Sequence, residues 1–442
     1  MRKYESAGVA VPEILLPKPG VDPSKWAVVA CDQYTSEPEY WDKAKAFVGG
    51  APSTLNFIYP EVYLKEPDPE ARIRSIRAAM KASLDQELLV SHEALIYVER
   101  LAAGKTRHGL VLALDLEQYD YHKGSTSLVR ATEGTILERI PPRVKIREGA
   151  PLESPHIMVL IDDPADKVIG PIREAKARHS KVYDFDLMMS SGHLTGYRVD
   201  DRALETGVMA ELEKLAEPAR FRAKYALDKE YPVLLYAMGD GNHSLATAKA
   251  IWERTKETAT DRAAVMSAPT RYALIELVNL HDAALVFEPI HRVLFGVSRD
   301  PLEDLRKHYG ARLTVEAVGS LAAMKAEVDA STAARQRIGV VRAEGHAVAE
   351  LRHAESNLPV GSLQVVLDAF MKSGGAHEID YVHGTEAVGS LGAKAGNVGF
   401  YLPAMNKHDL FKSVIEEGAL PRKTFSMGEA FEKRFYMECR RI

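Results

Sequence analysis

The chain has 442 residues, and its 46% hydrophobic and 27% charged side chains are ordinary for a globular protein. The formal net charge of -5 argues against a broad nucleic-acid-binding surface, and no stretch approaches the roughly 18 apolar residues of a membrane-spanning helix. The two cysteines, Cys31 and Cys439, are too few for a disulfide framework, and the first residues lack the pattern of a signal peptide. We therefore expect a cytoplasmic protein without a membrane partner, long enough for about two or three domains.

The first 299 residues alternate apolar runs with amphipathic stretches. Helical periodicity predicts helices over residues 70–89 and 202–227. Two apolar runs within residues 94–119, joined by a turn around Ala-Gly-Lys, predict a β-hairpin. The remaining apolar runs predict strands within these ranges: 25–34, 154–164, 231–238, 270–280 and 284–295.

The pattern changes near Ser298 to Pro301, where shorter helices and strands begin to alternate. A hairpin is expected over residues 337–352, followed by helix 361–373, strand 377–382, a helix around Glu386, strand 397–402 and helix 406–418. Residues 420–442 are too apolar and aromatic for a disordered tail, and we expect them to pack back onto the body. The sequence thus predicts a mixed α/β (α+β) protein with domains over residues 1–299 and 300–442.

The most distinctive motif is Asp240-Gly241-Asn242-His243-Ser244, which lies between a predicted strand and a predicted helix. The start of a helix carries unpaired N–H groups and a partial positive charge, which suit a phosphate or a carboxylate. Gly241 allows an unusual backbone angle and a close approach to a ligand. Asp240 is a candidate to orient His243, accept a proton or hold a cation. The alternative is that Asp240 or Asn242 only caps the helix, with His243 exposed.

A second cluster gathers cations around two prolines, and its members are Arg139, Arg143, Lys145 and Arg147. Because Pro141 and Pro142 forbid a continuous helix, we expect a loop that offers guanidinium groups to phosphate oxygens. Just before it, Glu133 lies in a short polar stretch, where a carboxylate is a candidate general base. The alternative is a solvated charged loop.

Three weaker features remain open between two interpretations. His291-Arg292 follows Pro289 on a strand-like run and is either a ligand-binding pair or a structural pair. Lys423-Thr424, near the C-terminus, is either an anion contact or a basic turn. Residues 31–37 form either a substrate-side loop or an ordinary helix entry.

Taken in this order, the motifs resemble the bacterial and archaeal domain-of-unknown-function family 1015. The family's hallmark, Asp-Gly-His-His-Arg at the start of a helix, reads Asp240-Gly241-Asn242-His243-Ser244 here. Three further family motifs are matched by Glu133-Gly134-Thr135, His291-Arg292 and Pro421-Arg422-Lys423-Thr424. Asn242 and Ser244 depart from the hallmark, so its guanidinium is missing unless Arg139, Arg143 or Arg292 supplies the charge.

This resemblance implies a ParB/sulfiredoxin-like nucleotide-binding domain, similar to free L-serine kinases, which phosphorylate the hydroxyl of the amino acid. It implies ATP or ADP as donor, free serine as the leading acceptor, and Mg²⁺ near Asp240. Glu133, Asp240 and His243 would be catalytic. The nucleotide and phosphate contacts would come from Gly241, Asn242, Ser244, Arg139, Arg143, His291, Arg292, Lys423 and Thr424. The alternatives are a nucleotide-binding switch or nucleic-acid-associated protein of the ParB superfamily, or a phosphohydrolase that uses the same site.

Overall fold

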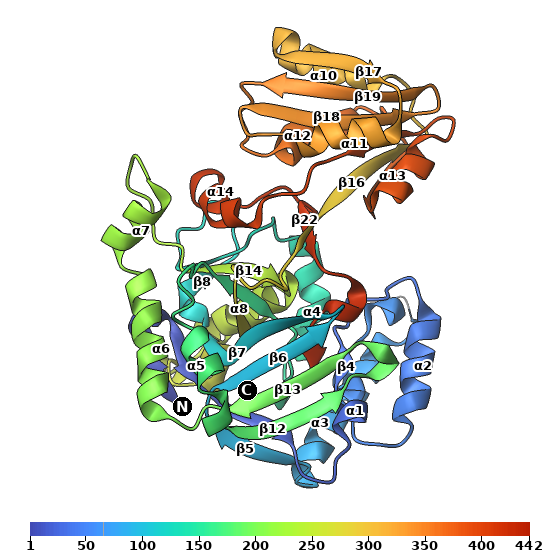
Figure 1. Ribbon diagram of the computed structural model, residues 1–442. Coiled ribbons are helices and arrows are strands. Elements are labelled where there is room, and N and C mark those ends of the chain that lie inside the picture. Colours follow the sequence, from blue (N-terminus) through green and yellow to red (C-terminus); the bar gives the residue numbers. More distant parts are fainter. Residues whose placement is uncertain (65) are drawn as a thin grey trace. The chain divides into compact units, whose positions relative to one another are not determined.

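The structure, a computed structural model, describes residues 1–64 and 66–442 (Figure 1). The chain divides into two compact units, which we call unit 1 (Met1–Leu285 with Gly428–Ile442) and unit 2 (Val286–Met427). Each unit has its own sheet and its own helices, so the predicted mixed α/β class is confirmed. The division into domains over residues 1–299 and 300–442 stays a prediction.

Within its described residues, unit 1 is built on an 11-stranded sheet. The path through this sheet is β12 (Ser180–Asp186), β13 (His193–Arg198), β6 (Ile96–Ala102), β7 (Lys105–Asp115), β15 (Tyr272–Asn279), β11 (Met158–Ile161), β14 (Tyr236–Asp240), β9 (Val129–Arg130) and β8 (Tyr119–Asp120). Of the two remaining strands, β2 (Val9–Val11) pairs with β7, and β1 (Arg2–Tyr4) pairs with β2. Strands β6 and β7 form the predicted hairpin, and both turn residues, Ala103 and Gly104, have the positive φ that a tight hairpin turn favours.

Both faces of this sheet are buried. Successive residues of a strand point to opposite faces, and the strands carry apolar side chains on both. Along β6, Ile96 and Val98 pack into one core, whereas Tyr97 packs into the other. The helices of unit 1 are α1 (Pro23–Trp26), α2 (Pro38–Val48), α3 (Pro69–Asp85), α4 (Ile140–Arg147), α5 (Gly170–Glu174), α6 (Arg202–Leu215), α7 (Pro218–Tyr225), α8 (Asn242–Thr258) and α9 (Arg262–Val265). Trp41 of α2 contributes to the first core and Trp252 of α8 to the second.

Two local predictions in unit 1 are corrected. The helix expected over residues 202–227 is two helices, α6 and α7, because Pro218 can begin a helix but cannot continue one. The strand expected within residues 25–34 is only β4 (Val28–Val29). It follows the short helix α1, in which Asp22 caps the N-terminus and Pro23 occupies the first position.

Unit 2 contains a seven-stranded sheet, and all of its residues are described. Its strands follow the order β17 (Leu313–Val318), β19 (Gly345–Arg352), β18 (Arg335–Arg342), β21 (Val398–Tyr401), β16 (Phe287–Phe295) and β20 (Glu378–His383), with β22 (Phe425–Met427) paired to β16. Its helices are α10 (Pro301–Tyr309), α11 (Leu321–Asp329), α12 (Pro359–Lys372), α13 (Thr385–Gly392) and α14 (Leu410–Glu417). The hairpin predicted over residues 337–352 is confirmed as β18 and β19.

The C-terminal segment Gly428–Ile442 is tied into unit 1 by short strands and buried ion pairs. Strand β23 (Phe435–Tyr436) pairs with β4, and β24 (Arg440–Arg441) pairs with β10 (Leu152–Glu153). Strands β3 (Glu13–Pro17) and β5 (Leu89–Glu93), which do not belong to the C-terminal segment, form a separate two-stranded sheet. Arg434 contacts the carboxylates of Glu276 at 2.9 Å and Glu438 at 2.8 Å. The C-terminal segment is therefore an integral part of the fold of unit 1.

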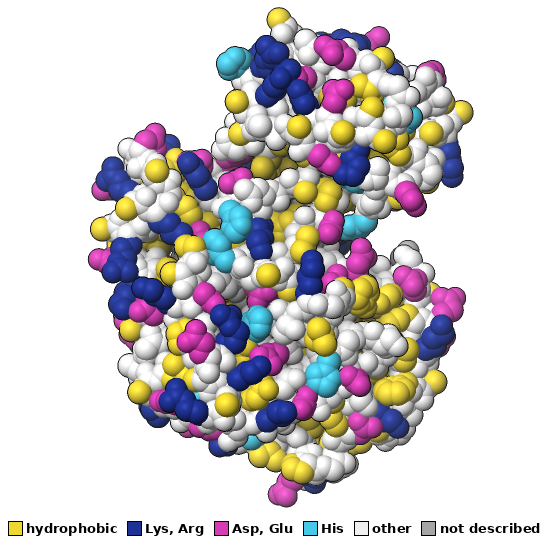
Figure 2. Space-filling model, viewed as in Figure 1, with side chains coloured by type: hydrophobic (Ala, Val, Ile, Leu, Met, Phe, Trp, Pro, Cys, Tyr) yellow, Lys and Arg dark blue, Asp and Glu magenta, His cyan; other side chains and the backbone are white. Residues whose placement is uncertain are grey.

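Among the residues that the structure describes, no helix is long and apolar enough to cross a membrane. On the face seen in Figure 2, Lys and Arg side chains are interspersed with Asp and Glu side chains.

Candidate functional site

The distinctive motif lies where strand β14 passes into helix α8. Strand β14 ends at Asp240, Gly241 follows with a φ of 77°, and α8 begins at Asn242. The predicted strand, tight turn and helix are therefore confirmed. A Cβ atom on Gly241 would lie 3.0 Å from Cα of Ile157, so both the backbone angle and the available space require glycine.

The sheet brings two other segments to this end of β14. Because β9 runs parallel to β14, the residues that follow Arg130 emerge beside Asp240. Because β11 runs antiparallel to β14, with Met158 opposite Asp240, the residues that precede Met158 reach the same place. Glu133 and His156 are consequently carried toward the start of α8 by strand pairing.

The start of α8, which we call the helix mouth (residues 241–244), has no side-chain cap among the described residues. Asp240 does not serve as the cap, because its Oδ1 accepts a hydrogen bond from Gly241 N, 2.8 Å away. Two buried polar atoms next to the mouth, Oγ1 of Thr135 and Oδ1 of Asn242, have no hydrogen-bond partner among the described residues. Uncapped N–H groups with unsatisfied polar side chains beside them form a setting suited to an anion.

The loop that carries Glu133 is fixed on both sides of that residue. Thr132 Oγ1 donates a hydrogen bond to the carbonyl of Met238 in β14, 2.8 Å away. Ile136 N donates to Nε2 of His243, 3.3 Å away. Glu133, which is half-buried, therefore lies on a short loop held against both β14 and the helix mouth.

The basic segment is a helix, so the loop predicted there is wrong. Helix α4 spans Ile140–Arg147, with Pro141 and Pro142 in its first turn, where the missing N–H group would have no partner within the helix. Arg143 and Arg147 lie four residues apart and share one face of α4. Lys145 is exposed instead, 3.9 Å from Glu70.

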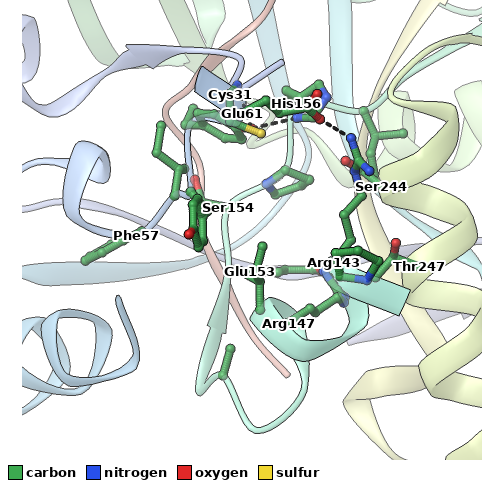
Figure 3. A pocket seen from close by; sticks show the side chains of 18 of the residues that line it. Cys31, Phe57, Glu61, Arg143, Arg147, Glu153, Ser154, His156, Ser244 and Thr247 are labelled. Atoms are coloured by element: carbon green, nitrogen blue, oxygen red, sulfur yellow. Dashed lines mark hydrogen bonds and ion pairs between the residues drawn. The ribbon is translucent and has the colours of Figure 1, made fainter. Parts of the chain in front are cut away.

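A cavity of about 380 Å³ is lined by residues of α4 and of the first turns of α8. Arg139, Arg143 and Arg147 line it together with Ser244 and Thr247 of α8. Figure 3 shows Phe57 and Ser154 on the side opposite α8, and Cys31, Glu61 and His156 grouped at one end. The apolar part of the wall includes Phe57, Ile58, Tyr59, Leu64, Met80 and Ile146. The described lining residues do not include Glu133, Asp240 or His243.

Two of the three arginines in the cavity already have carboxylate partners. Arg143 pairs with Glu61, and Arg147 Nη2 lies 2.6 Å from Oε2 of Glu153. The exposed side chain of Arg139 makes no ion pair with any described residue. An anionic ligand would thus find Arg139 available, whereas Arg143 would have to exchange Glu61 for the ligand.

Sequence reasoning missed a group of polar side chains at the same end of β14. Lys433 Nζ lies 3.3 Å from Oδ2 of Asp240. Burial by itself would raise the pKa of the Asp240 carboxyl, but Lys433 and His156 hold that pKa below its usual range. Tyr436 Oη hydrogen-bonds Nδ1 of His156 at 2.8 Å. No local sequence signal could have joined these residues, because only the sheet and the returning C-terminal segment bring them together.

The cysteine at this end of the cavity has a raised thiol pKa. Burial, reinforced by the negative charge of Asp32, raises the pKa of the Cys31 thiol to about 12. The thiol therefore stays protonated near neutral pH.

Asp240 is poorly suited to hold Mg²⁺ by itself. One of its oxygens accepts the Gly241 N–H and the other faces the Lys433 ammonium. Among the described residues, no group of three or more His, Cys, Asp or Glu side chains is arranged to hold a metal ion. Mg²⁺ is usually held by one or two carboxylates together with substrate phosphates, so a metal here would depend on oxygens of the ligand.

A family model described as "Protein of unknown function (DUF1015)" matches residues 15–370. The chain belongs to this family. No curated protein matches the sequence. The match ends before Lys433 and the rest of the C-terminal segment.

Several solved structures are similar to the chain at low identity. A free serine kinase in complex with AMP is 12% identical, with a TM-score of 0.40, covering 74% of this chain and 90% of that one. A conserved hypothetical protein from Pyrococcus furiosus is 11% identical, with a TM-score of 0.39 and coverage of 77% and 97%. SbnI from Staphylococcus aureus, with a C-terminal truncation, is 9% identical, with a TM-score of 0.37 and coverage of 72% and 82%.

The remaining predicted site residues of this family member lie in unit 2. His291 is buried on β16, where its Nδ1 accepts a hydrogen bond from Leu402 N at 3.1 Å. Burial, followed by the charge of Arg292, lowers the pKa of His291 to about 4. Arg292 is fully buried and donates to Oε1 of Gln364 at 3.1 Å. These contacts serve the core of unit 2, and a role for either side chain in ligand binding stays a prediction.

The predicted basic turn lies against that arginine. Arg292 Nη2 donates to the carbonyl of Arg422 at 3.1 Å, so the family's His-Arg and Pro-x-Lys-Thr motifs meet within unit 2. Lys423 is exposed and has a φ of 58°, and Thr424 Oγ1 donates to the carbonyl of Pro421 at 2.6 Å. The proposed anion contacts of Lys423 and Thr424 also remain predictions.

The turn at Gly241 leads to a stability prediction. Gly241→Ala should destabilise the protein by about 1–2 kcal/mol, because alanine pays that much for a left-handed backbone. The new Cβ would also press against Ile157. Gly207→Ala is the matched control, since a Cβ at this glycine of α6 meets nothing within 4 Å and should stabilise the helix by about 0.5–1 kcal/mol. Urea denaturation of both variants measures the difference, and equal effects would show that the turn tolerates a side chain.

Proposed function

We propose that the protein is a nucleotide-dependent phosphotransferase that phosphorylates the hydroxyl of a small molecule, with ATP or ADP as donor and free L-serine as the leading acceptor. Its nucleotide-binding part is proposed to be of the ParB/sulfiredoxin type. The observation that carries the proposal is the uncapped mouth of α8, beside which Thr135 and Asn242 keep unsatisfied buried polar atoms. This mouth opens, through Ser244, on a cavity of about 380 Å³.

The helix mouth is assigned to the phosphates of the donor. Gly241 lets the chain turn closely, and the N–H groups that follow it are aimed outward at the start of a long helix. The side chains of Asn242 and Ser244 add polar groups to the same place. Fixed donors of this kind stabilise the charge that develops on a transferring phosphoryl group without the cost of reorientation.

Glu133 is assigned to the acceptor as general base. Its loop is held at Thr132 and Ile136, on either side of it, so the backbone that carries the carboxylate is fixed next to the mouth. In the reaction, the carboxylate takes the hydroxyl proton while the hydroxyl oxygen forms a bond to the terminal phosphorus. The bond from that phosphorus to the bridging oxygen breaks, and the shortened nucleotide leaves with the electron pair. General base catalysis of this kind is typically worth about 10²–10⁴-fold in rate.

The cavity is assigned to the organic part of a ligand. Its volume falls in the range of about 300–1,000 Å³ that is usual for small-molecule sites. The apolar wall around Phe57, Tyr59 and Met80 suits a flat or apolar group, and Arg139 suits an anionic one.

A thermal-shift screen that crosses nucleotides with amino acids tests this function. A ligand at 100 times its Kd stabilises the folded state by about 2.7 kcal/mol, so a true donor should raise the melting temperature clearly. ATP or ADP should stabilise the protein, and serine should add to the shift or be phosphorylated. Phosphate release that does not depend on any acceptor would point to a phosphohydrolase instead. No shift with any nucleotide would contradict the proposal.

A further inference from the structure

Lys433 is a cation that contacts the residue directly before the helix mouth. Its ammonium lies 3.3 Å from Oδ2 of Asp240, and Asp240 directly precedes Gly241. The Lys433 side chain is only 12% exposed. A largely buried ammonium next to a helix start places further N–H donors beside those of the helix itself.

The ammonium has capacity to spare for a ligand. A lysine side chain has three N–H donors, and Asp240 accounts for one of them. Oδ1 of Asp240, the oxygen that does not face Lys433, accepts the hydrogen bond from Gly241 N at the start of the mouth. The pair therefore positions Lys433 beside the place where the phosphate is proposed to bind.

The backbone around Lys433 is held firmly in place. The next residue, Arg434, forms two buried ion pairs, with Glu276 and Glu438, and its carbonyl accepts a hydrogen bond from Ala30 N at 3.2 Å. Two residues after Arg434, the hydroxyl of Tyr436 hydrogen-bonds Nδ1 of His156 and accepts a hydrogen bond from Cys31 N. Lys433 thus projects from a fixed backbone just before β23, and little backbone entropy would be lost when it contacts a ligand.

We infer that Lys433 binds the phosphate held at the mouth of α8, and that the C-terminal segment thereby completes the site. The inference rests on the proposed function. The hallmark position Ser244 carries no charge, and Arg143 is paired with Glu61. The cations that remain for a phosphate at the mouth are therefore Arg139 of the cavity wall and Lys433, whose pair with Asp240 leaves ammonium N–H donors for a ligand. The ligand group that Lys433 recognises is the terminal phosphate of a nucleoside di- or triphosphate.

The test compares nucleotide affinities of Lys433→Met, Lys433→Gln and Lys433→Arg by titration calorimetry at low and moderate salt. Loss of one charged phosphate contact should weaken ATP and ADP binding about tenfold or more in the Met and Gln variants. Adenosine, which has no phosphate, should bind all variants alike. The Arg variant should recover most of the affinity, because it keeps the charge. Lys81→Met, at an exposed lysine of α3, is the matched control and should bind like the unmodified protein.

The outcomes separate this inference from the proposed function. If the unmodified protein binds ATP and the folded Met and Gln variants bind it equally well, Lys433 only neutralises Asp240 and the inference is overturned. If the unmodified protein binds no nucleotide at all, the proposed function falls and the inference falls with it. An equal loss for adenosine and ATP would also overturn the inference, because a phosphate contact cannot affect adenosine. Melting temperatures of every variant confirm that the compared proteins are folded.

Discussion

Arg434→Met should destabilise unit 1 by about 3–5 kcal/mol, because it leaves two buried carboxylates without their partner. Both Glu276 and Glu438 are 3% exposed at the side chain, and Arg434 itself is 4% exposed. Arg107, which lies 3.4 Å from Glu276, compensates only one of the two. Burial alone would lower the pKa of Arg434, but the carboxylates of Glu438 and Glu276 outweigh that effect and raise the pKa above its usual value. The arginine is therefore charged in the folded chain.

Chemical denaturation followed by circular dichroism measures this loss. Lys81→Met removes an exposed ion pair with Asp85 and should cost less than about 1 kcal/mol. A loss for Arg434→Met as small as that of the control would mean that the C-terminal segment contributes little to unit 1. Since Lys433 is the neighbouring residue, the same variant should also weaken nucleotide binding.

Glu133→Gln should lower turnover about 10²–10⁴-fold while nucleotide affinity stays unchanged, because the amide keeps the shape of the side chain but cannot take the proton. His243→Ala should lower both affinity and turnover, since it removes the bond that holds Ile136 N against the helix mouth.

The matched control is Glu138→Gln, which changes an exposed carboxylate that lines the cavity a few residues away. Nucleotide affinity, melting temperature and turnover are measured side by side on the three variants. Turnover at the unmodified level in both Glu133→Gln and His243→Ala would refute this assignment of the site. A similar loss of turnover in Glu138→Gln would indicate that Glu138 is the general base.

The local parts of the site could be predicted from the sequence. The run that ends in Asp240-Gly241 and the helical periodicity that follows it are short-range signals, and they placed the strand, turn and helix correctly. The tight hairpin of β6 and β7 was predicted for the same reason. The sequence does not indicate helix α4, because Pro141 and Pro142 would break the interior of a helix, whereas they are well tolerated in the first turn that they occupy.

The non-local parts of the site could not be predicted. Lys433 reaches Asp240 only because β23 pairs with β4 and carries the C-terminal segment to the end of β14. Glu61 meets Arg143 across the cavity, although neither residue has a local pattern that indicates a partner. Strand order and the path of the tail decide these contacts, and a single sequence carries no short-range signal for either.

The most direct measurement is a crystal structure of the protein with ADP or a non-hydrolysable ATP analogue. The proposed site predicts the terminal phosphate within hydrogen-bonding distance of the first N–H groups of α8 and of Lys433 Nζ, with Thr135 and Asn242 satisfied by the ligand. A nucleotide bound elsewhere, with the mouth of α8 left to solvent, would contradict it.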